Sequence, residues 1–193
     1  MSEYYLISQL PSLDGISENM PLPITEEHFF ELCNQVAGKK IQNEINKITL
    51  LPSKSYEKSS SSLIENWNNG ERKLRLALAK VRAERMKKSF DIENNVLSSE
   101  LLKIANTAIE IESPLEAEKF LNSYRLEFLE TLRPMDNFSE EFVYYYGLKL
   151  KLISHIRQFD TNAGEIAYKN IYNSIMNGDR LEAIQWQQIL AKL

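Results

Sequence analysis

The segment "LIENWNNGERKLRLALAKVRAERMKKS", residues 63–89, decides the fold of this chain. It contains one glycine and no proline, so few of its positions oppose a helix. Its apolar residues recur at alternating steps of three and four, which is the spacing of one face of an α-helix. These residues are Leu63, Trp67, Gly70, Leu74, Ala77 and Val81. The spacing therefore predicts one long helix over residues 63–89.

Shorter segments with the same periodicity fill most of the remaining chain. Thr25, Ser113 and Ser139 each precede a glutamate-containing first turn, which is typical of a helix N-cap. Helices are expected over 25–36, 41–48, 98–111, 113–134 and 138–159, around Ile166–Ile175, and over 179–193. The Ser-rich stretch 52–62 is expected to be a loop, because serine side chains compete with helical hydrogen bonds. We predict a single all-α domain over residues 1–193, a bundle of six to eight helices.

The N-terminus, residues 1–23, has a different pattern. Apolar and polar residues half alternate in "YYLISQL", residues 4–10, and Pro11 ends that run. Tyrosine and isoleucine favour extended backbone. We therefore expect an extended segment that packs along the helical body or pairs with the edge of a partner.

The helical periodicities also predict the core and leave one polar exception. The expected core residues are Phe29, Leu32, Trp67, Leu74, Leu78, Phe120, Tyr124, Phe128, Tyr145, Ile153 and Ile171. Lys149 lies among apolar residues on the same helical face. A lysine stem can cover apolar surface while its ammonium group reaches water, which is the favoured interpretation. A buried lysine paired with a carboxylate is the alternative.

Charge is the most informative feature for function. Eight basic residues lie between Arg72 and Phe90, against Glu84 alone, and Arg85 and Lys88 continue the apolar face of the long helix. The first interpretation pairs these bases with the acidic helix that contains Glu116, Glu118, Glu127 and Glu130. A second makes them a docking face for an acidic protein partner. The third, nucleic-acid binding, is disfavoured by the pI of 5.4.

We predict that this basic end docks a partner protein. Either the helix projects beyond the core here, or its charges are buried with partners. Surface ion pairs within one chain contribute only about 0–1 kcal/mol, so they explain such a concentration of charge poorly. The predicted partner-binding residues are Arg82, Arg85, Lys87 and Lys88.

The sequence contains no recognisable catalytic, cofactor or metal motif. The single cysteine, Cys33, excludes a disulfide framework and has the spacing of a buried helix face. The two histidines, His28 and His155, lack the spacing of zinc or di-iron sites. Glycine-rich phosphate loops and a nucleophilic-serine elbow are absent from the sequence. We expect a protein that is not an enzyme and that uses no cofactor and no metal.

The expected location follows from hydropathy. No run of 18 apolar residues is present, so no transmembrane helix is predicted. Glu3 stands where a signal peptide would carry basic residues, and no cleavage site follows the opening run. We therefore expect a cytoplasmic protein.

Several stretches, taken in order, resemble one family. They are "YYLISQLPSL", "PITEEHFFELC", "ERKLRLALAKVRAERM", "SPLEAEKFLNSYRLEFLETL" and "FSEEFVYYYGLKLKLISHIRQFD". This succession resembles a bacterial family encoded among the genes of V-type ATPases. That family is similar to a shortened form of the stalk C subunit of V/A-type ATPases, which is called d in eukaryotes.

The resemblance implies a non-catalytic helical subunit or accessory protein of a bacterial rotary ATPase. The stalk component of that name covers the membrane rotor ring and seats the central shaft, a role that needs shape and charge. The implied partners are protein subunits of that complex, without nucleic acid, at the cytoplasmic face of the inner membrane. The alternative is a free-standing helical adaptor that is unrelated to the ATPase.

Overall fold

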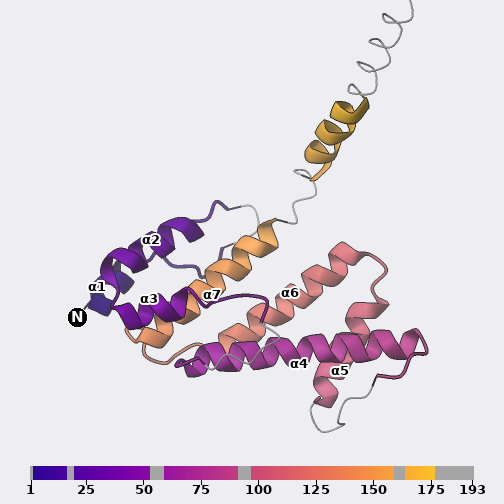
Figure 1. The fold of residues 1–193 in the computed structure, drawn as a ribbon, viewed down its shortest axis with the longest axis horizontal. Helices are drawn as coiled ribbons and strands as arrows, with labels where there is room; N and C mark the ends of the chain where they lie inside the picture. Colours follow the sequence, from indigo (N-terminus) through magenta and orange to yellow (C-terminus); the bar gives the residue numbers. More distant parts are fainter. Residues whose placement is uncertain (1, 17–19, 53–58, 91–96, 159–163, 177–193) are drawn as a thin grey trace, which may run out of the picture. The chain divides into compact units, whose positions relative to one another are not determined.

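The computed structural model describes residues 2–16, 20–52, 59–90, 97–158 and 164–176. Within these ranges the chain forms helices α1 to α7 and a further helical segment, 164–176, and it contains no strand (Figure 1). The all-α prediction is therefore confirmed. Its contacts divide the chain into two compact units, 1–156 and 157–193, where the sequence predicted one domain. The helix expected over 179–193 lies outside the described residues.

The N-terminal segment is a helix, so the expectation of extended backbone was wrong. Helix α1 spans Ser2–Gln9, and Leu6 and Ile7 are buried on one side of it while Tyr4 and Tyr5 are exposed. Burial of those two aliphatic side chains against the core outweighs the β preference of the tyrosines. The residues that follow, from Leu10, are not helical. They form a loop along the body that is anchored by the buried Leu13.

Helices α2, Glu26–Val36, and α3, Lys39–Ile45, follow the predicted pattern. The Thr25 hydroxyl accepts a hydrogen bond from the backbone N–H of His28, as an N-cap does. Phe29, Cys33 and Ile41 point into the core. The cap prediction is confirmed.

Helix α4, Ser62–Arg85, is the long helix that the periodicity predicted, and it ends four residues early. The Ser-rich loop ends at Ser61, which caps α4 through a hydrogen bond from the Ile64 N–H, so Ser62 is already helical. Residues 53–58 of that loop lie outside the described residues. Helix α5, Ser99–Glu110, and the first half of α6, Pro114–Thr131, pack beside the second half of α4. Figure 1 shows this group on one side of the first unit.

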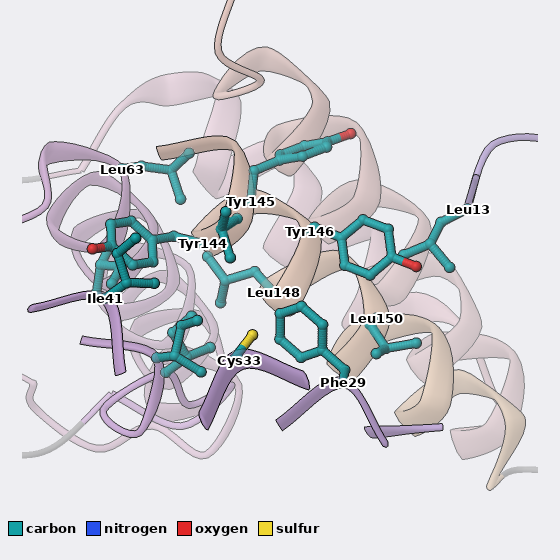
Figure 2. Packing of buried hydrophobic residues seen from close by; sticks show 14 of the residues in the cluster. Leu13, Phe29, Cys33, Ile41, Leu63, Tyr144, Tyr145, Tyr146, Leu148 and Leu150 are labelled. Carbon is teal, nitrogen blue, oxygen red and sulfur yellow. The ribbon is translucent and has the colours of Figure 1, made fainter. Parts of the chain in front are cut away.

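Two apolar cores lie along α4. The smaller joins α4, α5 and α6 around Leu74, Ala77 and Ala105. The larger joins α1, α2, α3, the start of α4, the end of α6 and α7, Glu140–Arg157. Figure 2 shows this larger core, in which the rings of Tyr144 and Tyr146 lie on opposite sides of α7.

An aromatic stack lies between the two cores. Phe128 stacks on Trp67 and on Tyr124, with ring centroids 6.2 and 6.4 Å apart. Gly70 makes this possible, because a Cβ at residue 70 would lie 2.3 Å from the Phe128 ring. The glycine in the α4 seam is therefore required by close packing.

Most of the predicted core is buried or packed against the core. Leu32, Phe120, Tyr124, Phe128 and Ile153 are half-buried at its edges. Phe29, Trp67, Leu74, Leu78 and Tyr145 are fully buried. Ile171 was placed wrongly, because its side chain is 61% exposed on the segment 164–176. Periodicity identified an apolar face there but could not show whether anything covers it.

Candidate functional site

Lys149 on α7 is a buried lysine with two carboxylate partners. Its side chain is only 9% exposed, and its Nζ lies 2.6 Å from Asp14 Oδ1 and 2.7 Å from Glu130 Oε1. The same Nζ donates a hydrogen bond to the Tyr145 hydroxyl at 3.3 Å. The favoured interpretation, an ammonium group in water, was therefore wrong. The alternative, a buried lysine paired with carboxylates, describes this residue.

The electrostatics of this cluster follow from its geometry. Burial alone would lower the pKa of Lys149, but the hydrogen bonds to Asp14 and Glu130 raise it above its ordinary value. The hydrogen bond from Lys149 holds the pKa of Asp14 below its ordinary value, and nearby Arg133 adds to this effect. Burial acts to raise the pKa of Glu130, yet its hydrogen bonds with Lys149 and Tyr145 lower it. Lys149 is thus held as a cation, unsuited to act as a nucleophile.

A pocket of about 230 Å³ opens beside this cluster. The loop after α1, the turn before α7 and one face of α7 form its walls. Its apolar and aromatic lining consists of Ile7, Leu10, Pro11, Leu13, Phe142, Tyr145 and Tyr146. Its polar lining includes Ser12, Asn137 and the charged groups of Asp14, Arg133 and Lys149. Apolar walls with a few convergent polar groups are typical of a ligand site.

Asp14 belongs to the loop, and local bonds shape that loop. The Tyr146 hydroxyl donates to the Pro11 carbonyl at 2.8 Å, and the Asp14 N–H donates to the Ser12 hydroxyl. Gly15 follows with a φ of 71°, a left-handed conformation that favours glycine. The Asp14 side chain nevertheless remains 57% exposed. A largely exposed carboxylate thus neutralises a buried ammonium group.

A second buried ion cluster lies between α4 and α6 with the opposite sign. The Glu71 side chain, 3% exposed, lies 3.1 Å from Arg125 Nε and 2.9 Å from Arg75 Nε. Arg125 also reaches Glu118 at 2.9 Å. Burial would lower the pKa of Arg125, but Glu71 raises it. Every member of this cluster is carried by a helix.

This cluster corrects the first interpretation of the charge pattern. The sequence suggested that bases of α4 face acids of α6, whereas in the pair between these helices α4 supplies the acid, Glu71. Three of the four acids named for that role have other partners. They are Glu116 with Lys119, Glu118 with Arg125, and Glu130 with Lys149.

The predicted partner-binding residues Arg82, Arg85, Lys87 and Lys88 are all exposed at the end of α4. Arg85 Nη1 donates to the Ile109 carbonyl at 2.9 Å. Of the two possibilities, burial of these charges with partners was wrong, because all four residues are exposed. Basic groups also suit the negative end of the helix dipole.

Lys87 and Lys88 close α4 in a Schellman turn. The Lys87 N–H donates to the Glu84 carbonyl, and the Lys88 N–H donates to the Ala83 carbonyl. Lys87 has a φ of 54° there, which glycine tolerates better than lysine. The turn presents both lysine side chains to solvent.

The segment 164–176 carries an exposed apolar stripe that we define as Tyr168, Ile171, Tyr172 and Ile175. These positions share one helical face, and their side chains are 51–69% exposed. The rings of Tyr168 and Tyr172 stack, with centroids 6.2 Å apart. Ile166, 61% exposed, falls on the opposite face. An apolar stripe of this kind is typical of a helix that binds a groove.

Cys33 and His28 are the residue types whose chemistry could suit catalysis or metal binding. Cys33 is buried, and burial raises the pKa of its thiol to about 12. The His28 ring is exposed and lies 3.8 Å from Glu31. No cluster of three His, Cys, Asp or Glu side chains that could hold a metal ion occurs among the described residues.

Two further findings concern membrane-spanning helices and similarity to known proteins. In the part of the chain that the structure describes, no helix combines the length and apolar character that crossing a membrane requires. Comparison of the chain with family models, with curated proteins and with solved structures gives no match.

Proposed function

We propose that this protein is a non-catalytic helical subunit that joins a larger protein assembly. The observation that carries the proposal is the exposed apolar stripe of Tyr168, Ile171, Tyr172 and Ile175. Contiguous exposed apolar groups mark interaction sites, because leaving them in water forfeits the free energy of burial. The spacing of the stripe matches the anchors of a helix that lies in a partner's groove.

The assembly that we propose is a bacterial V/A-type rotary ATPase. The support is the resemblance of five sequence stretches to the family encoded with V-type ATPase subunits. A role like that of the stalk C subunit requires contact surfaces on an all-helical body. The protein would then be peripheral to the membrane, held at the cytoplasmic face through the complex.

The basic end of α4 is the second proposed contact. Arg82, Arg85, Lys87 and Lys88 are all exposed there. Complementary charge between partners speeds their encounter and fixes their orientation. An acidic patch on a neighbouring protein of the assembly is the partner that these four side chains would fit.

Capture from the native cell tests the proposal with a matched pair of variants. Ile171→Ser removes an apolar group from the stripe, whereas Ile166→Ser removes an equally exposed isoleucine from the opposite face. We expect the tagged full chain and the Ile166→Ser variant to recover rotary ATPase subunits. The Ile171→Ser variant should recover at least several-fold less. Equal recovery by both variants would contradict a role for the stripe.

The same experiment separates the alternative function. A free-standing adaptor would use the same stripe with other proteins. The adaptor would be supported if the chain recovers defined partners, none of them an ATPase subunit, and if only Ile171→Ser loses them. That result would reject the ATPase assignment. Reversing Arg85 and Lys88 to Glu tests the basic end, and we expect weaker capture, most clearly at low salt.

A further inference from the structure

The two carboxylate partners of Lys149 differ in how firmly they are held. Glu130 is carried by α6 and is also hydrogen-bonded to Tyr145. Asp14 is carried by a non-helical loop at the pocket, and its side chain is more than half exposed. The ammonium group is held in place, because the Lys149 side chain is only 9% exposed and is carried by the buried part of α7. Asp14 is therefore the member of the cluster that can exchange with another carboxylate.

The cations around Asp14 point to what would replace it. Lys149 Nζ contacts one carboxylate oxygen of Asp14 at 2.6 Å, and Arg133 Nη1 lies 3.5 Å from the other oxygen. The Arg133 guanidinium group also lies over the Tyr145 ring, 5.8 Å from its centroid. Two cations thus bracket one carboxylate position at the edge of an aromatic surface. Arginine and lysine together are the usual recognition groups for a carboxylate.

The remaining walls of the pocket determine which group can be attached to that carboxylate. Its walls are the aliphatic side chains of Ile7 and Leu10 and the rings of Phe142, Tyr145 and Tyr146. A volume of about 230 Å³ is smaller than the roughly 300–1,000 Å³ of sites for drug-sized ligands. The space suits one carboxylate joined to one small apolar group.

We propose that this pocket binds a small apolar carboxylic acid whose carboxylate displaces Asp14 from between Lys149 and Arg133. The exchange keeps the charge of the cluster unchanged, so Lys149 stays neutralised throughout. It also frees the Asp14 end of the loop from α7. The same chemistry could come from a free acid or from the acidic side chain of a bound partner. Only this second source rests on the function proposed above.

Benzoate is a suitable probe, with benzamide as its uncharged control of the same shape. We would titrate each into the purified full chain and follow the binding isotherm by NMR. The variants are Asp14→Asn, which removes the internal competitor, and Arg133→Gln, which removes the cation at the pocket mouth. Lys103→Gln, which changes an exposed lysine of α5 outside the pocket, is the matched control. Circular dichroism establishes that each variant is folded.

We expect saturable benzoate binding to the unsubstituted chain and no saturable binding of benzamide. Asp14→Asn should bind benzoate about tenfold more tightly, because it removes the carboxylate that competes for Lys149 and Arg133. Arg133→Gln should bind benzoate about tenfold more weakly, because it removes one charged contact to the ligand. Lys103→Gln should bind as the unsubstituted chain does. If Asp14→Asn does not fold, the comparison of the unsubstituted chain with Arg133→Gln still tests whether the pocket binds benzoate. Absence of saturable benzoate binding, or equal affinity for benzamide, would overturn the proposal.

A competition experiment distinguishes the two sources. Partner proteins captured from native cells are washed with saturating benzoate. Release of the partner identifies its own carboxylate as the natural occupant, whereas retention identifies a free acid. Failure to capture any partner would count against the proposed function and would leave the benzoate result unaffected.

Discussion

The two buried ion clusters of this protein have central charges of opposite sign, and their partners are carried by different kinds of element. One surrounds a buried acid, Glu71, with Arg75 and Arg125, and all three are carried by helices. The other surrounds a buried base, Lys149, with two acids, of which Asp14 lies on a loop and is largely exposed. The comparison shows that burial of a charge does not decide its role. We infer that the setting of its partners, on a helix or on an exposed loop, decides whether the cluster only stabilises the fold or can also bind a ligand.

The largest expected effect is on the Glu71 cluster. Arg125→Met would leave a carboxylate that is 3% exposed with Arg75 as its remaining arginine contact. We expect a loss of about 3 kcal/mol in the free energy of unfolding, the lower end of the range for a broken buried pair. Denaturant unfolding monitored by circular dichroism would measure it. Arg75→Met is the control, expected to cost about 1 kcal/mol or less because Arg75 is 43% exposed.

A smaller effect is expected when the Lys149 cluster loses its base. Lys149→Met removes the shared base, but Arg133 stays beside Asp14 and Tyr145 stays beside Glu130. The two carboxylate side chains are also 57% and 42% exposed and can be hydrated. We expect a cost of about 1–2 kcal/mol by the same unfolding measurement. A cost larger than that of Arg125→Met would reverse the comparison.

Acid should weaken the Lys149 cluster. The pKa values of Asp14 and Glu130 are lowered in the folded state, so their contribution is present above their ordinary values of about 4. It is lost as the pH falls through the lowered values. Unfolding free energies measured from pH 6 downwards should therefore decline below about pH 4, and less steeply in Lys149→Met. Both carboxylates are more than a third exposed, so added salt should reduce the difference. Identical acid profiles for the two proteins would contradict this coupling.

The smallest effect is expected at the two exposed lysines that follow α4, Lys87 and Lys88. At the end of α4, Lys87→Gly removes a charge but also relieves a left-handed backbone, φ 54°. We expect a gain of about 0.5–1 kcal/mol in unfolding free energy. Lys88→Gly removes a similar charge without that relief and should give no gain. Equal changes for the two lysines would show that charge, not backbone conformation, dominates there.

Sequence reasoning located the helices well because their signals are local. Thr25, Ser113 and Ser139 accept the hydrogen bonds expected of caps, and three-and-four spacing gave the face of α4. It failed for α1, where burial of Leu6 and Ile7 overrides the preference of the neighbouring tyrosines. Periodicity describes a face, whereas only tertiary contacts determine whether that face is covered.

Only part of the candidate site, Lys149, could be identified from the sequence. Lys149 was conspicuous as a base among apolar residues, but its partner Asp14 lies 135 residues earlier in the chain. Nothing local in the sequence pairs two residues at that separation. Glu71 was missed for a related reason, because it stands directly before the basic run and resembles part of a solvated face. Both pairings, Asp14 with Lys149 and Glu71 with Arg125, arise from the packing of segments that are distant in sequence.

Two double-mutant cycles test the difference between the clusters most directly. One uses Asp14→Asn with Lys149→Met, the other Glu71→Gln with Arg125→Met, and each yields a coupling free energy from four unfolding measurements. Because Asp14 is the exchangeable partner and Glu71 is fixed, we expect the Glu71–Arg125 coupling to exceed the Asp14–Lys149 coupling by about 1 kcal/mol or more. An Asp14–Lys149 coupling that is equal or larger would contradict this, because Asp14 would then be as firmly bound as Glu71.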